Sequence, residues 1–141
     1  GYVMVDSTGF ALCGAGLNVT TRDLARFGEM MRLGGAFNGQ QIVPQAVVAD
    51  IAGGARQADF AKAGYATLPG WSYRNQWWVS HDEFGAYSAR GIHGQVCYVA
   101  PGAGTVIARF ASHPTAANGN GPLDRVSLPA YSALAAHLRG G

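Results

Sequence analysis

Two glycines near the middle of the chain stand where a backbone could come close to a reacting group. Gly91 and Gly94 flank Ile92 and His93 within the segment Tyr87–Pro101, which reads Y-S-A-R-G-I-H-G-Q-V-C-Y-V-A-P. Glycine leaves the neighbouring backbone uncovered, so a ligand can approach a peptide N–H without meeting a side chain. Because β-forming residues lie on either side, the segment predicts an edge strand of an active site.

The imidazole of His93 is the first candidate for a general base beside this strand. In an alternating strand, however, His93 points to the opposite face from Ile92, which favours a hydrogen-bonded structural histidine. The other histidines are His81, His113 and His137, and they lie without the spacing of metal ligands. We therefore expect no metal site and no other cofactor.

Helix and strand signals divide the chain into a helical start, a β-rich middle and a final helix. A capped amphipathic helix is predicted from Thr20 to Leu33, and a second helix has Pro44 at its first position. Residues 55–70 show no regular hydrophobic periodicity and are expected to form a long irregular connection with one helical turn. Ser127 is the predicted N-cap of the last helix. The β-rich segments are Trp71–Ser80, Ala86–Gly91, Gln95–Ala100 and Thr105–Ala111.

Short connections between these β-rich segments favour an antiparallel meander. Helices before and after the meander give an α+β fold in which an antiparallel sheet is covered by helices. We expect residues 1–141 to form a single, incomplete domain, because the chain starts at Gly1 without a methionine. A half-sheet of this kind would also leave a face or an edge uncovered.

Composition excludes several classes of function. The chain has 141 residues, of which 48% are hydrophobic and 13% are charged, too apolar a balance for a disordered protein. The net charge is only +2 and the basic residues are scattered, which argues against nucleic-acid binding. No apolar run approaches the roughly 18 residues of a membrane span. Cys13 and Cys97 are expected to be buried thiols, since two cysteines make neither a disulfide framework nor a zinc pattern.

Five segments spread over nearly the whole chain carry a family resemblance. They are G-A-G-L-N-V-T-T-R-D-L-A-R-F-G-E-M-M at 14–31, Q-I-V-P at 41–44, L-P-G-W-S-Y-R-N-Q-W-W at 68–78, A-R-G-I-H-G-Q-V-C-Y-V-A-P at 89–101 and A-S-H-P at 111–114. In this order they resemble the C-terminal part of the serine β-lactamase-like hydrolases, the superfamily of penicillin-binding proteins and class C β-lactamases. The W-S-Y-R-N-Q-W-W, H-G-Q and A-S-H-P segments are most similar to the 6-aminohexanoate-dimer (nylon oligomer) hydrolases and related esterases.

The resemblance implies acyl transfer, but the nucleophile is absent from this chain. In that superfamily a serine of S-x-x-K attacks the acyl carbon, and the lysine and a tyrosine of Y-x-N move protons. Lys62 is the only lysine here and the residue three before it is Asp59, so there is no S-x-x-K. Tyr73-Arg74-Asn75 matches Y-x-N, yet it follows the helix that the catalytic motif precedes in the family. This position favours a structural residue in a strand.

The third box of the superfamily, commonly K-T-G or H-T-G, corresponds here to Ala89, Arg90 and Gly91. An alanine where β-lactamases have a carboxylate-binding lysine argues against β-lactams and for esters or linear amides. The resemblance further implies that the backbone N–H of Ile92 is one of two donors to the oxyanion. The alternative is that these residues form a bulge in an ordinary sheet.

Cys13 and Gly14 precede the first helix, where the family has part of its pocket. They line the substrate site or form only a loop, and both readings stay open. We expect the chain to be the C-terminal segment of a serine hydrolase for a small ester or amide substrate, completed by the missing N-terminal part of the same domain. The alternative is a non-catalytic binding module derived from the same fold.

Overall fold

A five-stranded antiparallel sheet with the order β5-β6-β7-β8-β9 forms the centre of the molecule. The computed structural model describes residues 1–12, 16–116 and 123–139. The antiparallel meander predicted from the short connections is confirmed. The strands span Ser72–Arg74 (β5), Trp77–Val79 (β6), Tyr87–Arg90 (β7), Val96–Ala100 (β8) and Thr105–Arg109 (β9).

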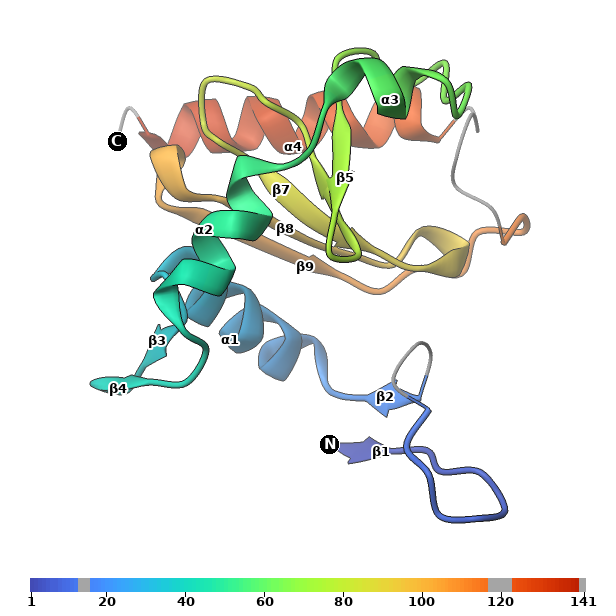
Figure 1. Cartoon of the computed structure of the whole chain (residues 1–141). Helices are drawn as coiled ribbons and strands as arrows, with labels where there is room; N and C mark the ends of the chain where they lie inside the picture. Colours follow the sequence, from blue (N-terminus) through green and yellow to red (C-terminus); the bar gives the residue numbers. More distant parts are fainter. Residues whose placement is uncertain (13–15, 117–122, 140–141) are drawn as a thin grey trace.

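Helices lie on both faces of this sheet (Figure 1). One face is covered by α1 (Thr21–Arg32) and α2 (Gln45–Gly53), and the other by α4 (Asp124–Arg139). The short helix α3 (Gln57–Ala61) contacts β5 and supplies the helical turn expected in residues 55–70. The predicted α+β fold, an antiparallel sheet covered by helices, is confirmed. None of the helices within the described ranges is both long and apolar enough to cross a lipid bilayer.

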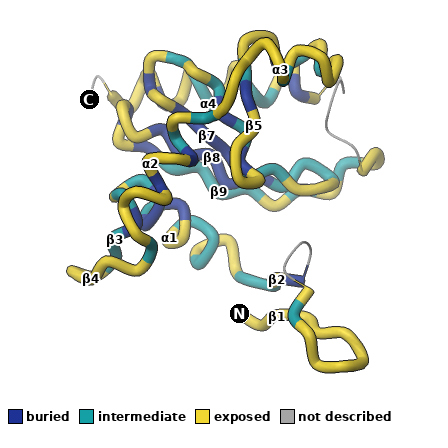
Figure 2. Tube along the Cα trace, viewed as in Figure 1, coloured by how far each residue is buried: buried dark blue, intermediate teal, exposed yellow. Residues whose placement is uncertain are grey.

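Alternation along the strands separates two hydrophobic cores. In β8, Cys97 and Val99 pack in the core under α1 and α2, while Val96 and Tyr98 pack in the core under α4. Successive side chains of a strand point to opposite faces, so one strand serves both cores. Figure 2 shows the buried residues concentrated in these strands, with further buried residues in α1 and α2.

Two predictions about the segment Tyr87–Pro101 are wrong. β7 and β8 lie in the interior of the sheet, and Ile92–Gly94 between them forms one turn of 3-10 helix instead of an extended strand. His93 breaks the strand, because its φ of 56° lies in the left-handed region. The pairing of β6 with β7 covers only Tyr87 and Ser88, so the last two residues of β7 have no β6 partner.

The predicted β-rich segment Trp71–Ser80 is a hairpin of β5 and β6. Its turn consists of Asn75 and Gln76, which have φ values of 48° and 68°. A two-residue turn of this type needs positive φ at both central residues, and Asn-Gly is its usual signal. Because glutamine stands in the glycine position, the turn was not recognised from the sequence.

The ends of the helices agree with the predictions at some positions and differ at others. The Thr20 hydroxyl accepts a backbone N–H of the first turn of α1, as predicted for an N-cap. Pro44 is the N-cap of α2, one residue before the position predicted for it. α4 begins at Asp124, ahead of the predicted N-cap Ser127, whose hydroxyl accepts a hydrogen bond from Arg109 instead. A small hairpin of β3 (Ala36–Phe37) and β4 (Gln40–Gln41) links α1 to α2.

The first residues form a hairpin that extends away from the sheet, with β1 (Tyr2–Val3) paired to β2 (Leu17–Asn18) (Figures 1 and 2). Sequence reasoning made no prediction for this hairpin. It exposes large apolar side chains to solvent. These are Tyr2, Val3, Met4, Val5, Phe10, Leu12 and Leu17.

Candidate active site

The turn between β7 and β8 places Ile92 at the surface. β7 ends at Arg90, Gly91 stays extended with φ −104° and ψ 175°, and Ile92 is 61% exposed. Within the described part of the chain, the Ile92 N–H donates no backbone hydrogen bond. A peptide N–H in this state can donate to an external acceptor, such as the oxygen of an acyl group.

Hydrogen bonds of His93 connect this turn to the segment that follows β9. Its N–H donates to the Ala116 carbonyl at 3.0 Å, and its carbonyl accepts the His113 N–H at 3.1 Å. Its ring Nδ1 lies 2.7 Å from the His113 carbonyl, which can only accept, so Nδ1 carries a proton. The expected hydrogen-bonded His93 is confirmed. Strand alternation does not orient His93, however, because His93 lies in a turn.

The three residues that correspond to the third box face in different directions. Ala89 packs against the core under α1 and α2. Arg90 points to the opposite face, where its Nη2 lies 2.5 Å from Asp124 Oδ1. Gly91 is exposed beside Ile92. Contacts of these three residues with a substrate stay predictions, and the Arg90 side chain is buried beside Asp124. Cys13 and Gly14 lie outside the described residues.

Arg90 is held by two neighbours, Asp124 and Trp78. Its side chain and that of Asp124 are only 7% and 8% exposed. Asp124, in the first turn of α4, also accepts the Thr67 hydroxyl at 3.2 Å. The guanidinium carbon of Arg90 lies 5.1 Å from the centre of the Trp78 ring, within the range of cation–π attraction. This burial and pairing fix the end of β7 to α4.

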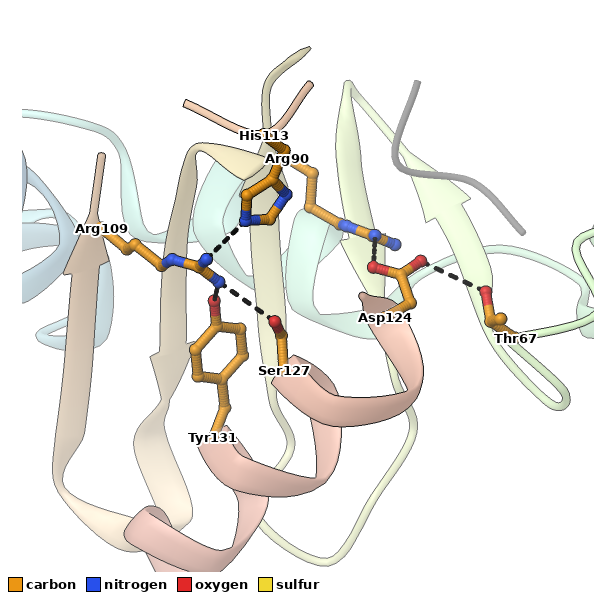
Figure 3. A network of polar contacts seen from close by, with 7 residues as sticks. All are labelled: Thr67, Arg90, Arg109, His113, Asp124, Ser127 and Tyr131. Atoms are coloured by element: carbon orange, nitrogen blue, oxygen red, sulfur yellow. Dashed lines mark hydrogen bonds and ion pairs between the residues drawn. The ribbon is translucent and has the colours of Figure 1, made fainter. Parts of the chain in front are cut away.

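A second arginine extends the polar contacts beneath the turn (Figure 3). Arg109, the last residue of β9, donates to Ser127 at 3.0 Å and to Tyr131 at 2.9 Å, both on α4. Its Nη2 lies 2.6 Å from Nε2 of His113. Sequence reasoning missed these contacts, and the one available signal was the position of His113 in the A-S-H-P segment.

Ser72 and His81 form a serine–histidine pair with Oγ and Nε2 2.7 Å apart, the geometry of a nucleophile and its base. Ser72 is 0% exposed, and its hydroxyl also accepts the Ala55 N–H at 2.9 Å. A fully buried hydroxyl cannot reach an acyl carbon. The pair is therefore structural and does not supply the nucleophile that the sequence lacks.

The Y-x-N match at residues 73–75 is also structural. Arg74 pairs with Asp50 of α2 at 2.6 Å, and the Asn75 side chain donates to the same carboxylate at 2.7 Å. Tyr73 lies in β5 and packs edge-on against Trp78. The predicted strand position of Tyr73 is confirmed, and its neighbours tie the β5–β6 hairpin to α2.

The buried thiol and phenol of the sheet are not ionised at neutral pH. Burial raises the pKa of Cys97 to about 11. Burial, and secondarily the charge of the neighbouring Cys97, raises the pKa of Tyr87 to about 12. The Tyr87 hydroxyl donates to the Met31 carbonyl at 2.9 Å. Cys97 is buried as predicted, whereas Cys13 lies outside the described residues. Across the described ranges, no group of three His, Cys, Asp or Glu side chains comes together as metal ligands do.

Comparison with known proteins gives one consistent relationship. No protein-family model matches the chain. It is 40% identical over 113 residues to the 6-aminohexanoate-dimer hydrolase of Paenarthrobacter ureafaciens, covering 79% of this chain and 29% of that protein. Its fold matches a solved structure named "Putative 6-aminohexanoate-dimer hydrolase from Bacillus anthracis" with a TM-score of 0.78 and 36% identity.

The structural match covers 98% of this chain and 34% of that one, so the chain spans about a third of the length of the proteins it matches. In sequence and in fold, the chain is therefore related to the 6-aminohexanoate-dimer hydrolases, in agreement with a C-terminal portion of the β-lactamase-like fold.

Proposed function

We propose that this chain is the part of a serine hydrolase that supplies one oxyanion donor, the Ile92 N–H, and a wall of the substrate site. The enzyme cleaves ester or linear amide bonds through an acyl-enzyme, and its S-x-x-K serine and Y-x-N tyrosine come from outside these 141 residues. The observation that carries the proposal is that the N–H of an exposed residue, Ile92, has no backbone acceptor among the described residues, in a relative of hydrolases.

The chemistry assigned to Ile92 is charge stabilisation. The serine hydroxyl gives its proton to the lysine and tyrosine as its oxygen bonds to the acyl carbon, and the carbonyl π electrons move to the carbonyl oxygen, which becomes an oxyanion. A peptide N–H aimed at that oxygen stabilises the intermediate more than the neutral carbonyl before it. The intermediate then expels the alcohol or amine, which takes up a proton, and water later releases the acid from the serine.

The substrate class follows from the charges near the turn. Ala89 offers no cation where β-lactamases bind a carboxylate with lysine, and Arg90 is already paired with Asp124. The described residues of this strand therefore favour an uncharged group beside the scissile bond. The relative of Paenarthrobacter ureafaciens is named for the 6-aminohexanoate dimer, which is a linear amide. Together these points support esters and linear amides over β-lactams.

Ile92→Pro tests the donor directly in the full-length protein that carries this chain. Proline removes the N–H, and Gly91 already has the extended conformation that a residue before proline requires. Proline also fits the first position of a helical turn. We expect kcat/KM for p-nitrophenyl butyrate and for the 6-aminohexanoate dimer to fall about 100- to 1,000-fold. The matched control Ile92→Val keeps the N–H and should react like the wild type.

Two results would contradict the proposal. Equal rates for the proline and valine variants would remove the Ile92 N–H from the mechanism. A wild-type protein that hydrolyses neither substrate and forms no covalent adduct with a fluorophosphonate, as judged by intact mass, would favour the non-catalytic binding module.

A further inference from the structure

We infer that His113 and Arg109 are positioning residues that hold the Ile92 N–H in its catalytic orientation. The inference rests on the proposed function, because it concerns the same oxyanion donor. Neither side chain contacts the substrate or the reacting atoms. Both act through the turn at 92–94, and Figure 3 shows the contacts of Arg109 with His113 and with Ser127 and Tyr131 of α4.

The turn has little support of its own. Within it, the Gln95 N–H donates to the Ile92 carbonyl at 3.3 Å, and the Gly91 N–H donates to the Gln95 carbonyl at 2.9 Å. The Ile92 side chain is exposed, so it does not anchor the turn in a hydrophobic core. Gly91 and Gly94 lie on either side of Ile92 and His93. The backbone freedom of glycine would let this N–H sample several directions. An external restraint is therefore needed to fix one.

His113 provides that restraint in two ways. Its backbone N–H and carbonyl both bond to His93, at 3.1 Å and 2.7 Å. Its ring also lies against Gly94, where a Cβ atom would come within 2.2 Å of Cε1 and 2.4 Å of Nδ1. The His113 ring beside Gly94 and the hydrogen bonds to His93 therefore restrain the turn together.

Arg109 in turn fixes the His113 ring. Arginine only donates, so the 2.6 Å contact between its Nη2 and Nε2 of His113 requires Nε2 to accept. The ring is then neutral, with its proton on Nδ1. The two hydrogen bonds of Arg109 to Ser127 and Tyr131 immobilise the guanidinium on α4. An unbroken series of contacts thus runs from α4 through Arg109, His113 and His93 to Ile92.

Small displacements at such a donor have large kinetic effects, since a shift of about 1 Å can cost on the order of 100-fold in rate. His113→Leu keeps the bulk against Gly94 but loses the acceptor, while His113→Gln places an amide oxygen near the position of Nε2. In the full-length enzyme we expect His113→Leu to lower kcat about 10- to 100-fold with little change in KM. His113→Gln should recover most of the loss, and Arg109→Met should resemble His113→Leu.

The rates are expressed per active site, counted from the burst of acyl-enzyme formation, so that unfolded protein does not lower kcat. Arg74→Met is the control, because its ion pair with Asp50 is exposed and joins the β5–β6 hairpin to α2, so its loss breaks none of the contacts described for this turn. Its kcat should equal that of the wild type. If His113→Leu and Arg109→Met keep wild-type kcat per site and lose only thermal stability, the positioning role is wrong.

A second readout separates failure of this inference from failure of the proposed function. Hydrogen exchange of the His93 amide, which bonds to the Ala116 carbonyl, reports the hold on the turn whether or not the protein is a hydrolase. We expect about tenfold faster exchange in His113→Leu than in His113→Gln. Unchanged exchange in both variants would overturn the inference even if the enzyme is active. If the wild-type protein is inactive and His113→Leu still exchanges faster, His113 does restrain the turn, but the oxyanion role is refuted.

Discussion

The two faces of the central sheet come from the same strands but are built by different interactions. Under α1 and α2 the sheet presents apolar side chains, including Cys97 and Val99. Under α4 it presents, besides the second hydrophobic core, two arginines, Arg90 and Arg109, engaged with carboxylate, imidazole and hydroxyl partners; we call this the polar face. Apolar packing supplies stability without direction, whereas hydrogen bonds and ion pairs also fix orientation. The candidate oxyanion turn is held from the polar face.

The polar face is also the less completely satisfied one. The described residues include four buried side-chain atoms without a hydrogen-bond partner, and all four belong to residues on this face or next to it. Removing a partner on this face would leave a further buried polar group unsatisfied, which costs the desolvation penalty of that group. The atoms are Ser88 Oγ, Arg90 Nη1, Tyr98 Oη and His113 Nδ1.

The largest expected effect on stability comes from breaking the buried ion pair of the polar face. Asp124→Ala leaves the Arg90 charge buried without its carboxylate, which should lower the free energy of unfolding by about 3–5 kcal/mol. Urea unfolding measures the change. The control Asp59→Ala disrupts pairs with Arg56 and Lys62 that are more than half exposed, and should have little effect. Equal losses in the two variants would erase the distinction between buried and exposed pairs.

On the apolar face, ionisation of Cys97 should destabilise the protein in alkali. Its pKa is raised from 9.0 to about 11 by burial, so the folded state favours the neutral thiol. The corresponding stabilisation is complete below pH 9.0 and is lost as the pH rises to about 11. Two pH units correspond to about 2–3 kcal/mol.

The measurement is the free energy of unfolding between pH 8 and 11, roughly the window set by the two pKa values, for the wild type and Cys97→Ala. The variant is less stable at every pH because it loses packing, but its curve should fall less steeply. Tyr87 titrates at higher pH and contributes to both curves. Parallel curves would show that burial does not raise the pKa of the Cys97 thiol.

The smallest effect concerns how closely α1 approaches the apolar face. A Cβ atom at Gly28 would lie 2.5 Å from Cγ1 of Val106 and 2.8 Å from Sγ of Cys97. Gly28→Ala should therefore push α1 from the sheet and cost about 1–3 kcal/mol by thermal or urea unfolding. Gly53→Ala at the end of α2 meets no atom within 4 Å and should stabilise the helix by about 0.5–1 kcal/mol. A stabilising Gly28→Ala would mean that this contact is loose.

The elements that could be predicted are those whose signals are local. The Thr20 cap marks the start of α1, and Gly34 and Gly35 mark its end. Short connections mark the meander. Elements fixed by distant partners could not be predicted. α4 starts at Asp124, where the carboxylate meets Arg90, 34 residues away in the sequence. His93 takes a left-handed conformation, although a histidine in the sequence does not by itself predict that conformation.

The candidate site was predictable to the same extent. Two glycines and a family resemblance were enough to single out Ile92. The contacts that hold Ile92 were not predictable, because Arg109 and His113 belong to a different strand and loop and meet the turn only in the fold. Composition and spacing do not encode such side-chain contacts across strands.

The N-terminal hairpin has a practical consequence for anyone who prepares these residues alone. Tyr2 and Phe10 are 67% and 72% exposed, on a two-stranded ribbon whose outer edges have no partner strand among the described residues. Exposed apolar side chains and open strand edges are the common starting point for self-association in water. Light scattering of the isolated chain should therefore rise with concentration, and deletion of the ribbon should suppress the rise.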